Sequence, residues 1–320
     1  MLNATKQKLS PYRMHIIASI LLGGNAIAIK VVTNQIDPVT VIAIRYLIVG
    51  SIIAFIYRKN IGNLSVQGLR SVLISSVLVI IFALTYYIGI QYTTALKAGL
   101  ILLITPLVLY IIAITFLKEK FIMKVLIGSL IGLAGSLINI GSPIFTAGSF
   151  NKGDIMLFAG SCILAAHMAF TKYSFKYCSF YQILSLRQII AGVSITLYIL
   201  ASGSQTNLDN LTLTGVLALI HLIFIGGVLG LLMFYSSLRK LRVEDTAPIY
   251  YLVPLTTIII AAVGLGESLS YSDYIGATII LFGVALAHPH HHHVLHRMHV
   301  PEQSRLQKIV GFFKNYLHAK

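Results

Sequence analysis

Ionisable side chains inside apolar sequence are the residues of this chain best suited to chemistry. Lys30, Arg45 and Arg187 lie within or near the ends of long apolar runs, and Lys172 ends another. A cation in such a place attracts a carboxylate or phosphate group, or its long side chain reaches the headgroup region or a loop acid. Both interpretations stay open for Lys30, whereas a structural role is favoured for Arg45 and Arg187.

The carboxylates are placed in the opposite way. All nine lie at or beyond the ends of the apolar runs: Asp37, Glu119, Asp154, Asp209, Glu244, Asp245, Glu267, Asp273 and Glu302. A charge at the centre of a membrane span is costly and marks function by default. The placement therefore argues against a buried carboxylate as a proton relay or as the partner of a cationic substrate.

Asn25 and His167 are candidate substrate contacts. They occupy matching positions 142 residues apart in two apolar runs. An imidazole titrates near neutral pH, so His167 is also the candidate for proton coupling. The alternative is a hydrogen bond between helices.

A second group of candidates combines flat apolar area with a hydrogen-bonding tip. Its members are Tyr86, Tyr87, Gln91, Tyr235 and Tyr251. They suit the lining of a substrate cavity, and they suit anchoring at the membrane interface equally well.

Pro106 and Pro254 form a matched pair inside apolar runs. A proline within a helix frees a carbonyl group and produces a kink, so we expect these two residues to be hinges. Gly128 and Gly132 are spaced for close helix packing, either within the chain or between two copies. A monomer and a weakly associated homodimer both remain open.

The elements that position these residues follow from composition. Hydrophobic residues make up 57% of the chain and charged residues only 10%, and the mean hydropathy is +0.86. So few charges cannot cover the surface of a soluble domain, and only helices or closed barrels span a membrane. We expect an all-α integral membrane protein with ten spans at 12–33, 39–57, 69–90, 95–116, 124–140, 151–171, 181–201, 214–237, 246–265 and 273–287.

Basic residues divide unequally between the two sides of these spans. With a cytoplasmic N-terminus, one side holds Lys6, Lys8, Arg13, Arg58, Lys59, Arg70, Lys118, Lys120, Lys124, Lys172, Lys176, Arg239, Lys240, Arg242, Arg297, Arg305, Lys308, Lys314 and Lys320. The other side holds only Lys97 and Lys152. The positive-inside rule therefore predicts both termini in the cytoplasm of a multi-pass protein of the bacterial inner membrane.

Two collinear sets of residues predict an internal repeat. Lys30, Arg45 and Gly50 recur 142 residues later as Lys172, Arg187 and Gly192, and Tyr87, Pro106, Glu119, Gly128 and Gly135 recur 148 residues later as Tyr235, Pro254, Glu267, Gly276 and Gly283. Because each half has five spans, an odd number, the second half has the opposite orientation in the membrane. Such inverted repeats are typical of transporters, with a substrate site near the membrane midplane. We divide the chain into an N-terminus (1–11), two repeats (12–148 and 149–287) and a tail (288–320).

Several motifs resemble those of the EamA family of the drug/metabolite transporter superfamily. They are Gly23-Gly24-Asn25, Ala43-Ile44-Arg45-Tyr46, Ala247-Pro248 to Pro254, and Leu265-Gly266-Glu267, echoed by Leu117-Lys118-Glu119. The chain departs from the family in lacking Trp and in carrying Lys118 where a Gly is usual. The resemblance implies ten helices around a central cavity, lined mainly by spans 1, 3, 4, 6, 8 and 9, and alternating access for a small metabolite.

The tail carries a run of histidines at His290, His291, His292 and His293. Clustered imidazoles bind zinc, nickel or copper, but adventitious binding is the simpler interpretation, and we expect no metal site and no cofactor. Residues 301–320 predict an amphipathic helix on the membrane surface. Scattered basic residues do not form a nucleic-acid-binding face, so the expected partners are a small-molecule substrate and lipid.

The sequence thus favours a secondary transporter of an amino-acid-like or other zwitterionic solute. Uptake of a nucleoside-like metabolite such as S-adenosylmethionine is the alternative within transport. A membrane enzyme or a metal-binding membrane protein is the alternative from another class, but GxSxG, HExxH and paired acids are absent from the sequence. We therefore expect no enzymatic activity.

Overall fold

The computed structural model describes residues 10–93, 95–140, 151–203, 208–265 and 271–287, and its regular elements there are all helices. They are α1 (Pro11–Gly23), α2 (Asn25–Thr33), α3 (Pro38–Ile56), η1 (Arg58–Asn60), α4 (Val66–Gly89), η2 (Ile90–Tyr92), α5 (Ala95–Ile101), α6 (Ile104–Thr115), α7 (Met123–Ile140), α8 (Lys152–Ser174), α9 (Phe180–Ser202), α10 (Leu213–Ile220), η4 (His221–Gly230), α11 (Leu231–Lys240), α12 (Val243–Tyr250), α13 (Leu252–Leu265) and α14 (Tyr271–Ala287). The predicted all-α class is confirmed for this part of the chain.

Within the part of the chain that the structure describes, six helical runs are long and apolar enough to cross a membrane. They are Pro11–Thr33, Pro38–Ile56, Val66–Tyr92, Lys152–Ser174, Phe180–Ser202 and Leu213–Lys240. Three shorter apolar helices cover Ile104–Thr115, Met123–Gly135 and Tyr274–Ala287. Large apolar side chains remain exposed along these helices, as a lipid environment requires. The chain is therefore a multi-pass membrane protein.

Short polar motifs fix where several of the long helices begin. The Asp37 carboxylate accepts hydrogen bonds from the backbone N–H groups of Val39 and Thr40 at 2.9 and 3.0 Å, and Pro38 follows at the first helical position. Ser179 and Gln182 form a reciprocal capping box at the start of α9. These caps satisfy N–H groups that a helix leaves free at its N-terminus.

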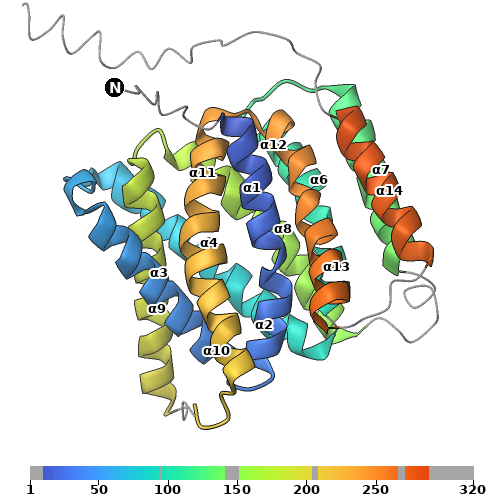
Figure 1. The fold of residues 1–320 in the computed structure, drawn as a ribbon. Coiled ribbons are helices and arrows are strands. Elements are labelled where there is room, and N and C mark those ends of the chain that lie inside the picture. The colour runs from blue at the N-terminus through green and yellow to red at the C-terminus, as the bar shows by residue number, and fades with distance from the viewer. Residues whose placement is uncertain (1–9, 94, 141–150, 204–207, 266–270, 288–320) are drawn as a thin grey trace, which may run out of the picture. The chain divides into compact units, whose positions relative to one another are not determined.

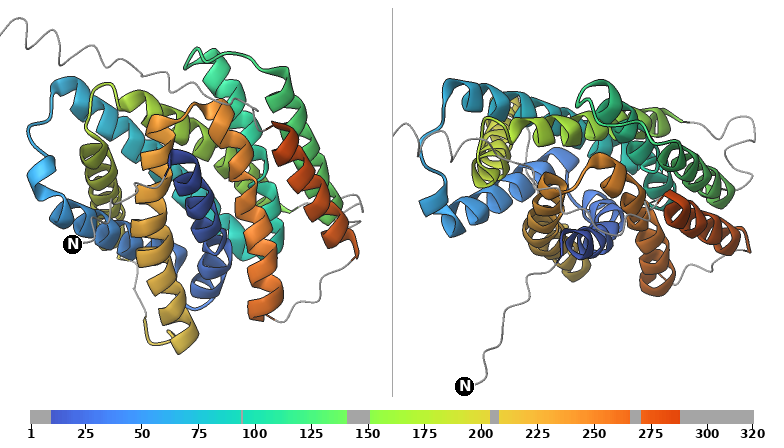
Figure 2. Two further views of the ribbon diagram at one scale, coloured as in Figure 1. Left: turned by 45° about the horizontal axis from the view of Figure 1, so that its top comes forward. Right: turned by 90° about the horizontal axis from the view of Figure 1, so that it is seen from above.

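The helices pack in pairs that join distant parts of the sequence. Helix α3 packs along α9, α4 along α8, and α7 along α14. Helix α1 contacts both α11 and α13 and lies between them in two views (Figures 1 and 2). The central position of α1 and α2 is what places Asn25 near the middle of the helices.

Helices α7 and α14 meet through glycine, and they lie side by side in Figure 1. A Cβ atom added at Gly128 would lie 2.5 Å from the Gly283 carbonyl oxygen and from the Ala287 Cβ. The predicted close-packing motif is thus used within the chain.

Replacing Gly128 by Val should lower the melting temperature in detergent, because the added atoms overpack this contact at a cost of about 1–3 kcal/mol. Ile127→Val is the matched control, since Ile127 is 43% exposed on the same helix. Equal melting temperatures for the two variants would contradict the packing described for α7 and α14.

Candidate functional site

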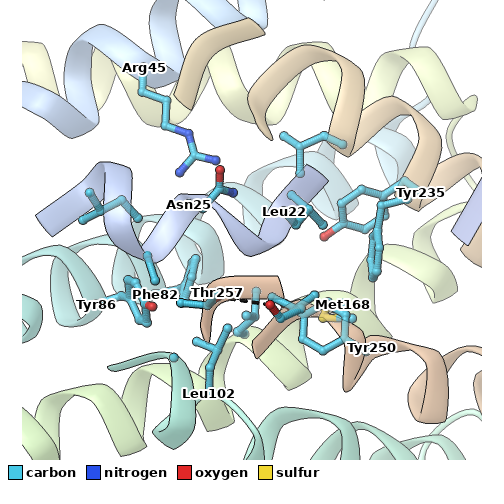
Figure 3. A pocket seen from close by; sticks show the side chains of 17 residues that line it. Leu22, Asn25, Arg45, Phe82, Tyr86, Leu102, Met168, Tyr235, Tyr250 and Thr257 are labelled. Atoms are coloured by element: carbon cyan, nitrogen blue, oxygen red, sulfur yellow. Dashed lines mark hydrogen bonds between the residues drawn. The ribbon is translucent and has the colours of Figure 1, made fainter. Parts of the chain in front are cut away.

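A cavity lies among the helices, and both halves of the chain contribute to its wall (Figure 3). Its polar lining is Asn25, Arg45, Tyr86, Tyr235, Tyr250 and Thr257, and its apolar lining is Leu22, Ala26, Ile29, Phe82, Gly99, Leu102, Leu164, Met168, Leu231, Phe234 and Val253. The cavity volume is about 100 Å³, against the ~10–15 Å³ that one water molecule needs. The space suits several waters or the compact body of a small solute.

Helices that line the cavity are interrupted beside it. Helices α1 and α2 are separated at Gly24, α5 and α6 at Leu102 and Leu103, and α12 and α13 at Tyr251. The segment η4 is a π-helix of ten residues. Interrupted helices and π turns release backbone polar groups, and within a membrane they occur where protein or a cavity surrounds them.

The two predicted hinge prolines lie next to these interruptions. Pro106 is in the first turn of α6, four residues after Leu102, and Pro254 is in the first turn of α13, three residues after Tyr251. A proline lacks an N–H group, and its ring excludes the carbonyl of the preceding turn. Both prolines thus follow a break in the helical backbone, and a hinge motion at either proline stays a prediction.

Two glycines allow α2 and η4 to approach. A Cβ atom at Gly24 would lie 2.6 Å from the His221 ring, and a Cβ atom at Gly226 would collide with the Asn25 side chain. Asn25 therefore packs directly against the backbone of the π-helix. Its Oδ1 atom is buried and has no hydrogen-bond partner.

Arg45 is the cation of the cavity wall. Its side chain comes from α3, is 7% exposed and donates a hydrogen bond to the Tyr87 hydroxyl. The guanidinium carbon lies 5.8 Å from the Tyr46 ring centre, and the Nε atom has no partner. Figure 3 shows the guanidinium reaching toward Asn25. A cation and an unpartnered amide oxygen thus share one part of a mainly apolar cavity.

His167 belongs to a different cluster, outside the cavity lining. Arg187 Nη1 lies 3.1 Å from His167 Nε2 and donates to Thr171 Oγ1 at 2.9 Å. A guanidinium can only donate, so Nε2 must accept and the imidazole is neutral. The remaining ring proton is then assigned to Nδ1, which lies 3.4 Å from the Tyr235 hydroxyl. In this arrangement His167 anchors Arg187, and proton coupling at His167 stays a prediction.

The two repeat-related lysines do not line the cavity. Lys30 Nζ donates to the backbone carbonyls of Ile90 and Gln91 at 3.0 and 3.2 Å, just after α4. Lys172 Nζ donates to the Leu241 carbonyl at 2.6 Å, just after α11. Cations satisfy the free carbonyls at a helix C-terminus. Lys30, predicted as a substrate contact, has these backbone partners in the structure.

Glu119 joins three helix ends. One carboxylate oxygen lies 3.0 Å from Lys172 Nζ, and the other accepts the Val243 N–H at 2.8 Å. The preceding residue, Lys118, has a φ of 58°, which is the left-handed region that favours glycine. This conformation lets the Glu119 N–H return to the Ala113 carbonyl at 3.0 Å.

The remaining predicted contacts divide between the cavity and the layer behind it. Tyr86 and Tyr235 line the cavity. Tyr87 lies behind it and accepts the Arg45 hydrogen bond, and Gln91 donates to the Thr33 carbonyl. Tyr251 points elsewhere, since its hydroxyl donates to the Ser129 carbonyl at 2.8 Å.

Sequence reasoning missed several lining residues. Tyr250 lines the cavity in place of its neighbour Tyr251, and Arg45 was predicted only as a charge near a span end. Phe82, Met168 and Thr257 carried no sequence signal beyond their place in an apolar run. The spacing of Phe82 and Tyr86, one helical turn apart, is the pattern that could have identified that wall.

Within the described ranges no group of three His, Cys, Asp or Glu side chains could hold a metal ion. His290 to His293 and residues 301–320 lie outside those ranges, so the tail predictions stay untested.

The model of the EamA-like transporter family matches residues 10–141 and 151–288. An uncharacterized transporter of Bacillus subtilis, YyaM, is 25% identical over 64% of this chain and 68% of its own length. Proteins named probable amino-acid metabolite efflux pumps are 23% identical in Salmonella typhimurium and 24% in Escherichia coli, each over 84% of this chain and 91% of its own length. A solved crystal structure shares the fold with a TM-score of 0.70 at 16% identity, over 87% of this chain and 96% of the other.

The His167 cluster yields a stability prediction. His167→Gln keeps a hydrogen-bond acceptor for Arg187, whereas His167→Leu leaves a buried charged donor unpaired at a cost of about 1–3 kcal/mol. We expect the Leu variant to melt at a clearly lower temperature than the Gln variant in detergent. The order would be reversed or absent if Arg187 did not depend on this acceptor.

Proposed function

The chain belongs to the EamA-like transporter family, and on this premise we propose that it carries a small zwitterionic, amino-acid-like metabolite across the bacterial inner membrane by alternating access. The observation that carries the substrate class is the pairing of Arg45 with Asn25 on the wall of a mainly apolar cavity. A carboxylate would bind the guanidinium, and an ammonium group would donate to Asn25 Oδ1. The aromatic and apolar walls would hold the rest of the solute.

Ten spans are the architecture that we propose. They correspond to α1–α2, α3, α4, α5–α6, α7, α8, α9, α10–η4–α11, α12–α13 and α14. The two matched family ranges support two related halves. Repeat-related contacts support them too, because Lys30 and Lys172 each donate to carbonyls just after a helix end. Five spans per half make the halves inverted, and the distribution of basic residues supports cytoplasmic termini.

The ion pair between Lys172 and Glu119 supports a closed cytoplasmic end. Both side chains are 11% exposed, and the pair connects the ends of α6 and α8 with the segment between α11 and α12. By the basic-residue rule this end faces the cytoplasm. We therefore propose that a substrate leaves on that side only when these three ends separate.

The names of two relatives, amino-acid metabolite efflux pumps, agree with an amino-acid-like cargo. A nucleoside-like cargo has only the tyrosines of the wall in its favour, so we prefer the amino-acid-like cargo. Secondary transport leaves the coupling ion open, and proton coupling at His167 stays a prediction.

Transport should be tested with purified protein in liposomes, using a panel of labelled amino acids, amines and nucleosides with and without a pH gradient. We expect saturable flux of at least one amino acid. Arg45→Gln should lower its transport efficiency roughly 10- to 100-fold, as for the loss of a charged hydrogen bond. Arg239→Gln is the matched control, because Arg239 is an exposed cation at the end of α11. Flux of an amine or nucleoside but no amino acid would contradict the proposed cargo.

The closing role of Glu119 gives a second prediction. Glu119→Gln weakens the contact with Lys172, and a loss of about 1–2 kcal/mol would raise the population open on that side roughly 5- to 30-fold. Leu164→Cys, placed in the cavity wall in a background with Cys162 and Cys178 replaced by Ser, reports this opening. A membrane-impermeant maleimide should label it faster from the cytoplasmic face in inside-out vesicles. Unchanged labelling would show that the ion pair does not close the cavity.

A further inference from the structure

Arg187 is a buried cation that has no acidic partner among the residues that the structure describes. Its side chain is 1% exposed, and its Nε atom has no partner. The ion pairs found among the described residues are Lys172–Glu119 and Arg242–Glu244, and neither involves Arg187. Neutral partners, His167 and Thr171, hold one end of the guanidinium. Burying a cation without a carboxylate is expensive, so a buried arginine at this place calls for a functional explanation.

Tyr235 separates Arg187 from the cavity. The guanidinium carbon of Arg187 lies 4.4 Å from the centre of the Tyr235 ring, and the same ring lines the cavity. The face of a tyrosine ring attracts a cation, so the ring covers the charge and partly stabilises it. A movement of this one side chain would expose the Arg187 guanidinium to the cavity.

The related residues of the first half are in a different arrangement. Arg45 corresponds to Arg187, and Tyr87 corresponds to Tyr235, by the offsets of 142 and 148 residues. Arg45 itself lines the cavity and bonds the Tyr87 hydroxyl, with its guanidinium carbon 6.0 Å from the Tyr87 ring centre. One arginine is presented to the cavity while its counterpart is covered by its tyrosine.

The two arginines lie on opposite sides of the place where α3 and α9 cross. A Cβ atom at Gly50 would meet Gln188 and Ile189, and one at Gly192 would meet Leu47. This register places Arg187 opposite residue 51 or 52 of α3, about 10 Å along the helix from Arg45 at 1.5 Å per residue. In the proposed topology Arg45 is the outer of the two cations and Arg187 the inner.

We propose that Arg187 is a second binding residue for the carboxylate of the substrate, used when the cavity opens toward the cytoplasm. Arg45 holds the carboxylate while the Lys172–Glu119 end is closed. Opening of that end moves the Tyr235 ring off Arg187, and the carboxylate passes from one guanidinium to the other. This proposal rests on the proposed transport of a carboxylate-bearing solute.

The test measures transport from each face separately. Intact cells report the outer face and inside-out vesicles the cytoplasmic face, and the probe is a labelled mixture of the twenty protein amino acids. For Arg187→Gln we expect KM at the cytoplasmic face to rise roughly 10- to 100-fold, as for a lost charged hydrogen bond, with a smaller change at the outer face. Arg45→Gln should show the reverse bias, and Arg239→Gln should change neither.

A purely structural role for Arg187 predicts a different outcome. Transport would then fall equally from both faces, or would not change, and either result would overturn the proposal while leaving transport by the wild type intact. No flux of the mixture by the wild type would instead overturn the proposed function and this inference with it.

A second variant protects the test against a folding defect in Arg187→Gln. Arg187→Lys keeps the charge but loses the planar fork that binds a carboxylate with two hydrogen bonds. At the cytoplasmic face of this variant, 3-phenylpropionate should inhibit more weakly than in the wild type, and phenethylamine, which has no carboxylate, should inhibit equally. Equal inhibition of variant and wild type by 3-phenylpropionate would overturn the proposal.

Discussion

The central part of this structure depends on the burial of two guanidinium cations that have no carboxylate partner in the described part of the chain. Arg45 and Arg187 are 7% and 1% exposed, in helices that lipid surrounds. An ordinary ion pair would stabilise them, but it would also remove any interaction with an anionic solute. The protein instead uses a tyrosine hydroxyl, a neutral imidazole, a threonine and aromatic ring faces. Such partners reduce the cost of burial and leave the positive charge unneutralised.

Part of this arrangement is marked in the sequence by pairs of residues at matching offsets. The offsets singled out Arg45, Arg187, Tyr87 and Tyr235, and the structure adds that each arginine lies against the tyrosine of its own half. The helical class followed from composition. The number and inversion of the spans remain inferences from the repeat and the charges, because three of the shorter apolar helices would not be assigned as spans by length alone.

Other features could not be predicted, for reasons of geometry. Periodicity tells which residues share a helix face only while the helix is continuous, and the chain breaks at Tyr251 between α12 and α13. After this break the helical periodicity no longer predicts which side chain faces the cavity, so Tyr250 lines the wall where Tyr251 was expected. Lys30 is a similar case. Its side chain donates hydrogen bonds to carbonyls at the end of another helix, and the sequence alone does not show that this end lies nearby.

The opposite placement of acids and cations gives the two regions of the protein different properties. Glu119 and Lys172 neutralise each other at a helix end, where the left-handed backbone conformation of Lys118 positions the carboxylate. Separating the two charges costs energy, so the ion pair holds that end together. Around the cavity, by contrast, Arg45 meets only neutral groups among the described residues, so an incoming carboxylate displaces no protein anion. Under the proposed function, ion pairing controls access at the end, and the neutral surroundings of Arg45 among the described residues let the cavity bind an anionic group.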